Sequence, residues 1–127
     1  MNRRLVLSLL VLPLLLVACA FGYYARGTLS DVPGELRGKA FPGNTVGGGR
    51  FVLTDGEGRL RCDGEMAAPD SSPVPVSCEG ESGMGIVRCS DGRVMSARWT
   101  AISCRSFEGS AEDTRGNRLL FRVERKP

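Results

Sequence analysis

The sequence predicts an all-β protein, a small antiparallel sheet built from about three hairpin repeats after an N-terminal signal helix. Apolar runs are interrupted again and again by Gly-containing turns, and no window after residue 30 has the 3.6-residue apolar period of a helix. The clearest unit is 83–99, GMGIVRCSDGRVMSARW, where two apolar runs flank Asp91-Gly92. Because glycine takes the positive φ that tight turns need, this stretch is predicted to be a hairpin.

Two further stretches have the same layout, so Gly56, Gly92 and Gly116 are the predicted turn glycines. Side chains alternate between the faces of a strand, so repeats should carry apolar residues at equal offsets from the turn. Two of the three units carry apolar residues at the same offsets from the turn glycine. These are Met95, Ala97 and Trp99 in one unit and Leu119, Phe121 and Val123 in the other. The first unit is shifted by an extra Gly58, which predicts a β-bulge. The alternative is that a Gly-rich chain produces such matches by chance.

The layout resembles MORN repeats, in which a Gly-x-Gly run leads to an Asp-Gly turn and a further strand. Residues 91–99 follow that spacing, although Met95 stands where the repeat has an aromatic residue. Cys62 and Cys78 stand in the corresponding slots of two weaker matches. The resemblance implies a scaffold or a contact for membranes or proteins, and it implies no chemistry.

Residues 1–18 are predicted to be a signal peptide. Arg3 and Arg4 precede the apolar run Leu5–Val17, which is too short to span a bilayer and has the length of a signal-peptide core. The run ends in Leu16-Val17-Ala18-Cys19, which resembles the lipobox of bacterial lipoproteins. That resemblance implies cleavage before Cys19 and acylation of its thiol, so that acyl chains hold the protein in a membrane of the cell envelope, facing the periplasm.

Two other fates of the N-terminus stay open. The small residues Ala18 and Ala20 also fit ordinary signal cleavage, which would release a secreted protein beginning at Phe21. Alternatively the apolar stretch continues through Tyr24 as an uncleaved anchor with interfacial aromatic residues. In well-studied lipoproteins an Asp after the acylated Cys favours the inner membrane, so Ala20 favours the outer membrane.

The predicted domain organisation is a signal peptide (1–18), an acylated Cys with a flexible Gly- and Pro-rich tether (19–35) and a small β domain (36–127). Within that domain we expect an edge strand, a first hairpin, a Pro-rich loop, a strand, the central hairpin, a further strand and a last hairpin that is short at its start. Their ranges are 36–41, 49–66, 67–75, 76–81, 83–99, 100–104 and 109–123.

Four cysteines remain when Cys19 is set aside, and they are predicted to form two disulfides: Cys62, Cys78, Cys89 and Cys104. An even number of cysteines in a small exported domain is typical of disulfides. A metal site is disfavoured because the spacings are long and no Cys-x-x-Cys pair is present. Three pairings are possible; Cys62–Cys78 with Cys89–Cys104 is weakly preferred, since the first would close the Pro-rich loop.

The charge of the chain does not favour nucleic acid as a partner. The formal net charge of +3 falls to +1 once a signal peptide carrying two arginines is removed. Nearly all basic residues are arginines, and six of them stand at predicted outward strand positions: Arg59, Arg61, Arg88, Arg98, Arg118 and Arg122. Acidic residues are interleaved with them, which favours a solvated sheet face over a phosphate or lipid site. Arg88, Arg98 and, if it were exposed, Trp99 form the possible contact surface.

The sequence favours a non-enzymatic role. It contains no His, which excludes His-based triads and His metal ligands, and no catalytic residue, metal or cofactor is predicted. Glu79 and Glu81 form the alternative site: one residue apart in a predicted strand, they would share a face and could act as an acid/base pair with a nearby arginine. The preferred function is a lipid-anchored envelope protein with a structural or protein-binding role, and the alternative is a small periplasmic enzyme or ligand-binding domain.

Overall fold

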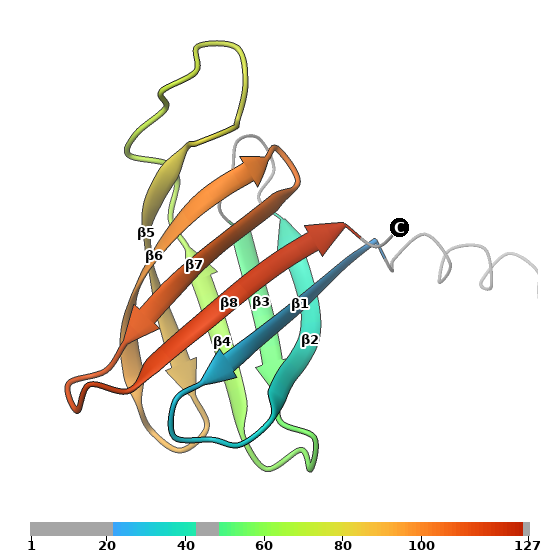
Figure 1. Cartoon of the computed structure of the whole chain (residues 1–127), viewed down its shortest axis with the longest axis vertical. Coiled ribbons are helices and arrows are strands. Elements are labelled where there is room, and N and C mark those ends of the chain that lie inside the picture. The colour runs from blue at the N-terminus through green and yellow to red at the C-terminus, as the bar shows by residue number, and fades with distance from the viewer. Residues whose placement is uncertain (1–21, 43–48, 126–127) are drawn as a thin grey trace, which may run out of the picture.

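Eight antiparallel strands form a closed barrel in the computed structural model, which describes residues 22–42 and 49–125 (Figure 1). The strands are β1 (Tyr23–Leu29), β2 (Glu35–Pro42), β3 (Gly49–Thr54), β4 (Arg61–Met66), β5 (Ser82–Cys89), β6 (Val94–Ser103), β7 (Ser106–Glu112) and β8 (Arg118–Arg125). Each strand pairs with the next, and β1 pairs with β8, so no strand is left with an open edge. The described residues contain no helix, and the predicted signal helix lies outside them.

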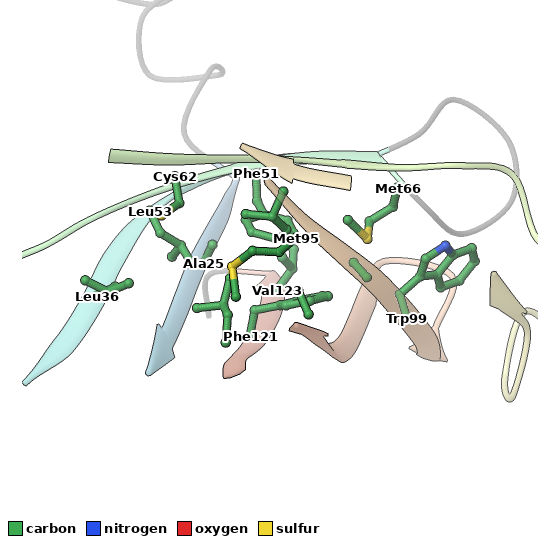
Figure 2. Packing of buried hydrophobic residues seen from close by; sticks show 14 of the residues in the cluster. Ala25, Leu36, Phe51, Leu53, Cys62, Met66, Met95, Trp99, Phe121 and Val123 are labelled. Carbon is green, nitrogen blue, oxygen red and sulfur yellow. The ribbon is translucent and has the colours of Figure 1, made fainter. Parts of the chain in front are cut away.

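The barrel interior is a packed core made by every second residue of each strand. In β6 the buried residues are Met95, Ala97, Trp99 and Ala101, with exposed residues between them. The inward phase predicted from the sequence is therefore confirmed for this strand, and Leu119, Phe121 and Val123 of β8 confirm it too. Figure 2 shows such side chains pointing inward from several strands. Eight strands enclose a space that side chains fill, as expected for a small barrel.

Inward-facing glycines make room for the large rings of the core. Phe51 of β3 lies directly opposite Gly64 of β4, and a Cβ on Gly64 would come within 2.3 Å of the Phe51 ring. Phe121 of β8 lies in the same way opposite Gly109 of β7, where an added Cβ would come within 2.6 Å of the ring. In each pair, a phenylalanine on one strand thus lies opposite a glycine on the next. This arrangement makes room for the ring and suits the tight curvature of the sheet.

The up-and-down order gives the barrel two different ends. Four short turns form what we call the turn end: 30–34, 55–60, 90–93 and 113–117. At the other, which we call the loop end, β1 begins, β8 ends, the 67–81 loop joins β4 to β5 and a tight turn joins β6 to β7. The 67–81 loop projects beyond the barrel at this end (Figure 1).

Positive φ angles show which glycines the turns require. Gly92 (φ 94°) and Gly116 (φ 86°) have them, as predicted, but in the β3–β4 turn the residue is Gly58 (φ 71°), not Gly56. The expected bulge at Gly58 is therefore wrong: the extra residue lengthens the turn, where Asp55 N donates to Leu60 O, and β4 begins only at Arg61. The register irregularity lies instead between Ala101 and Ser103, where β6 pairs with β7.

Several predicted boundaries are wrong. The expected tether (19–35) contains β1, so the β domain begins before residue 36, and 36–41 forms the inner part of β2, which is paired on both sides. Residues 76–81 are loop, and 100–104 largely continues β6. The last hairpin is not short at its start, because β7 begins at Ser106. The two-strand reading of 49–66 is confirmed.

Two disulfides join the four cysteines of the described part, as predicted, but in a different pairing. Cys62 of β4 bonds Cys89 of β5, and Cys78 of the loop bonds Cys104 of the β6–β7 turn. The preferred pairing of Cys62 with Cys78 is wrong, because Cys62 and Cys89 face each other directly in the β4–β5 register, with Cα atoms 4.0 Å apart. The first disulfide thus lies in the core, and the second closes the base of the loop.

Candidate functional site

Apolar and aromatic side chains pack the interior of the barrel, which directs the search for a site among the described residues to the outer surface. Four aromatic rings meet near the centre of the barrel: the Phe51 and Phe121 centroids are 4.7 Å apart, and Phe107 lies 6.0 Å from Trp99 and 6.3 Å from Phe121. The Trp99 indole N–H donates to Ala67 O (3.1 Å), so the buried ring has its polar group satisfied.

A shallow groove of about 750 Å³ crosses the outer face of β6, β7, β8 and β1. The strand register lays two rows of side chains along it: Arg98, Ser110, Leu120 and Thr28 in one, and Thr100, Glu108, Arg122 and Arg26 in the other. Guanidinium and hydroxyl groups of this kind bind carboxylates, phosphates and backbone carbonyls. The groove is thus a polar surface with three arginines and an apolar side chain, Leu120, in its floor.

Carboxylates balance the arginines of the groove. Arg122 pairs with Glu124 and lies 3.9 Å from Glu108, and Arg26 lies 3.9 Å from Glu124. Tyr24 Oη donates to Glu124 (2.9 Å). That hydrogen bond, assisted by the two arginines, lowers the pKa of Glu124, and the same bond raises the pKa of Tyr24. The groove therefore presents paired charges, which favours a mixed-charge protein surface over a lone anion.

Arg98 is the arginine of the groove that the sequence singled out. Its side chain is more than half exposed and lies 3.4 Å from Asp70 of the 67–81 loop. Arg88 faces outward as well, but it lies four residues farther along β5 than Met84, the residue opposite Arg98. Trp99 was predicted as a contact only if exposed; it is fully buried and is the largest core side chain, so it belongs to no outer surface. The structure therefore does not bring these three residues together.

The structure also places the two residues of the alternative site, Glu79 and Glu81, in different environments. Glu79 and Glu81 lie in the loop before β5 and not in a strand, because Gly80 between them has a positive φ (77°). Glu79 is exposed and Glu81 is buried, so the premise that they share a face is wrong. Arg88, one proposed partner, lies seven residues along β5 from Glu81, roughly 23 Å at the rise of a strand.

The other predicted arginines follow the expected pattern with one exception. Arg61, Arg88, Arg98, Arg118 and Arg122 are outward strand residues. Arg59 lies in the β3–β4 turn and not in a strand. Cys19 lies outside the described residues, and its acylation stays a prediction.

Sequence reasoning missed an ion-pair network at the turn end. Arg93 donates through both Nη atoms to the two carboxylate oxygens of Asp31 (2.8 and 2.9 Å), and it pairs with Asp91 (2.8 Å). These hydrogen bonds lower the pKa of both aspartates and raise that of Arg93. The network ties the β1–β2 turn to the β5–β6 turn, which is a structural role. Asp91 and Arg93 were visible in the sequence, but Asp31 fell in the expected tether.

No protein-family model matches this chain, and the search of curated proteins finds no similar sequence. The argument for function therefore rests on the residues themselves. Within residues 22–42 and 49–125, no group of three or more His, Cys, Asp or Glu side chains is placed to hold a metal ion. In the same part of the chain, no helix is long and apolar enough to cross a membrane.

Proposed function

We propose that this protein is a non-enzymatic, lipid-anchored component of a bacterial cell envelope, held by acyl chains on Cys19, that contacts another envelope protein through the outer groove of its barrel. Cleavage before Cys19 would make that residue the N-terminus of the mature protein. Ala20 after it favours the outer membrane, with the barrel facing the periplasm.

The observation that carries this proposal is the pairing of the cysteines. The chain has five, and the four that the structure describes are joined in two disulfides. Disulfides of this kind persist in oxidising compartments such as the periplasm, which supports export. Cys19 then remains as the one cysteine outside these bonds, directly after an apolar run of signal-peptide length.

The packed interior supports a contact role over ligand capture. Small barrels that carry ligands keep an internal cavity, whereas four aromatic rings fill the centre of this one. The groove offers Arg98 and the paired charges around Arg122, and arginine is among the residues that contribute most to protein interfaces.

Cross-linking of the native protein in intact envelopes tests this function. We expect one stoichiometric protein partner for the wild type and for Arg88→Glu, a charge reversal outside the groove. We expect its loss for Arg98→Glu, which reverses charge within the groove at a position that is also exposed. Absence of a stoichiometric partner for the wild type would contradict the contact role, and equal effects of the two reversals would contradict the groove as its site.

A further inference from the structure

A group of the exposed large apolar side chains of the described residues lies at the loop end of the barrel. Four of the eight lie there: Phe41, Val74, Val76 and Ile102. The other four lie on the barrel wall or toward the turn end: Met84, Ile86, Val94 and Leu120. An asymmetric distribution of this kind indicates a surface that contacts an apolar phase or partner.

The 67–81 loop holds the most exposed of these side chains in a fixed position. Its tip reads Pro73-Val74-Pro75-Val76, and Val76 is 97% exposed. The base is closed by the Cys78–Cys104 disulfide, by a hydrogen bond from Gly80 N to Ala101 O (2.9 Å) and by a bridge between the backbones of Ser71 and Ser82. The loop projects beyond the barrel (Figure 1), and both valines of its tip are exposed.

The predicted anchor is attached to this same end. Only residues 20–22 separate Cys19 from the start of β1 at Tyr23. Four fully extended residue steps span at most about 14 Å. The headgroup layer on each side of a bilayer is roughly 5–8 Å thick, so acyl chains on Cys19 would hold the loop end of the barrel at the membrane surface. The long tether predicted from the sequence would have imposed no such orientation.

The turn end is charged and carries an excess of carboxylates. Its turns contain Asp31, Asp55, Glu57, Asp91 and Asp113 against Arg59, Arg93 and Arg115. Exposed carboxylates are repelled by an anionic lipid surface and are costly to bring into the interface. The loop and turn of the loop end also hold more carboxylates than arginines, with Asp70, Glu79 and the buried Glu81 against Arg105, so the apolar side chains and the anchor distinguish that end, not its charge.

We propose that the loop end is a second membrane contact, in which Val74 and Val76 enter the headgroup region of the leaflet that holds the acyl chains of Cys19. Phe41 and Ile102 would lie at the lipid surface beside them. This inference rests on the proposed lipid anchor. This contact would fix the orientation of the barrel, with its loop end at the membrane and its turn end pointing away from it. The groove on the barrel wall would then face the space beside the barrel, where a partner protein can reach it.

Quenching by brominated lipids tests this contact in the full mature protein, purified from membranes and reconstituted in phosphatidylcholine vesicles. Val76→Trp adds a fluorophore at the loop tip, and Val94→Trp adds one at an exposed valine of the turn end. The buried Trp99 contributes the same background to both and reports whether each variant is folded. We expect the added emission of Val76→Trp to be blue-shifted and largely lost in brominated vesicles, and that of Val94→Trp to be unchanged.

Other outcomes overturn the contact. If the intact mass shows the acyl chains and Val76→Trp is not quenched, the anchor stands and the second contact is wrong. Equal quenching of both variants, or of Val94→Trp alone, contradicts the orientation. A blue shift of Val76→Trp that requires an added envelope protein and not lipid assigns the loop to a protein partner instead. If the mass shows no acyl chains, the proposed anchor fails, and quenching of Val76→Trp by added vesicles still decides whether this end binds lipid.

Discussion

Trp99 of β6 lies directly opposite Gly83 of β5, and its indole ring covers the space that a side chain at Gly83 would occupy. A Cβ built on Gly83 would lie 2.8 Å from the indole Nε1 and 3.0 Å from Ala68 O. This relationship repeats the Phe51–Gly64 and Phe121–Gly109 pairs, so each ring depends on a glycine across the strand. The barrel is closed on a packed core, which directs the search for function to its outer surface.

We expect Gly83→Ala to destabilise the fold by roughly 1–3 kcal/mol, because the added methyl group forces the Trp99 ring to move in a full core. Gly56→Ala is the matched control: a Cβ there meets nothing within 4 Å, and the free energy of unfolding should change by less than about 0.5 kcal/mol. Urea unfolding followed by Trp99 fluorescence measures both. Equal stabilities of the two variants would show that the indole does not occupy this space.

Gly92→Val should lower the free energy of unfolding by more than about 1 kcal/mol, since a β-branched residue is strained at a positive φ. No neighbouring atom lies within 4 Å of a Cβ at Gly92 or at Gly56, and only Gly92 has the positive φ. The comparison of Gly92→Val with Gly56→Val therefore isolates backbone strain from crowding. If Gly56→Val is the more costly substitution, the turn assignment is wrong.

Non-reducing peptide mapping should find Cys62 linked to Cys89 and Cys78 linked to Cys104, with no free thiol among these four residues. Replacing both members of the first pair by Ala should cost roughly 2–4 kcal/mol, because the disulfide restricts the unfolded chain. Four titratable thiols, or a link between Cys62 and Cys78, would contradict the structure.

Acid should weaken the Arg93 network. The pKa values of Asp31 and Asp91 are lower in the folded protein than the ordinary 3.8, so their stabilisation is present above pH 4 or so and is lost as the pH falls through the lowered values. Both aspartates are about 40% exposed, so solvent screens each pair to about 1 kcal/mol or less. We expect Arg93→Gln to be less stable than wild type at pH 7, and we expect this difference to shrink as the pH falls below the ordinary pKa of 3.8.

Chemical denaturation of both proteins across this pH range gives the measurement. The control is Arg115→Gln, which removes an exposed cation from a neighbouring turn. Its stability should run parallel to that of wild type at every pH. A difference between Arg93→Gln and wild type that does not shrink as the pH falls would show that the two aspartates do not carry the effect.

The sequence predicts the β class and the inward phase of Met95, Ala97 and Trp99, because that strand alternates large apolar and polar residues without interruption. It does not reveal β1, where the buried positions include Ala25 and Gly27, side chains too small to produce an apolar alternation. Barrel closure depends on the pairing of β1 with β8, which local sequence does not encode. The hairpin repeat and the resemblance to MORN repeats stay predictions.

The candidate sites were predictable only where they depended on strand phase. The outward position of Arg98 follows from the inward position of its neighbour Trp99. The disulfide pairing and the separation of Glu79 from Glu81 depend instead on register and on a positive-φ glycine, neither of which alternation specifies. The groove was missed because Arg26 and Thr28 were assigned to a tether.

The intact mass of the protein extracted from membranes tests the central claim most directly. The account predicts a mature chain that begins at Cys19 and carries the added mass of acyl chains, and it predicts that Cys19→Ala abolishes both the acylation and the cleavage before that residue. An unmodified chain that begins at Phe21, or a full-length chain that begins at Met1, would contradict the lipid anchor.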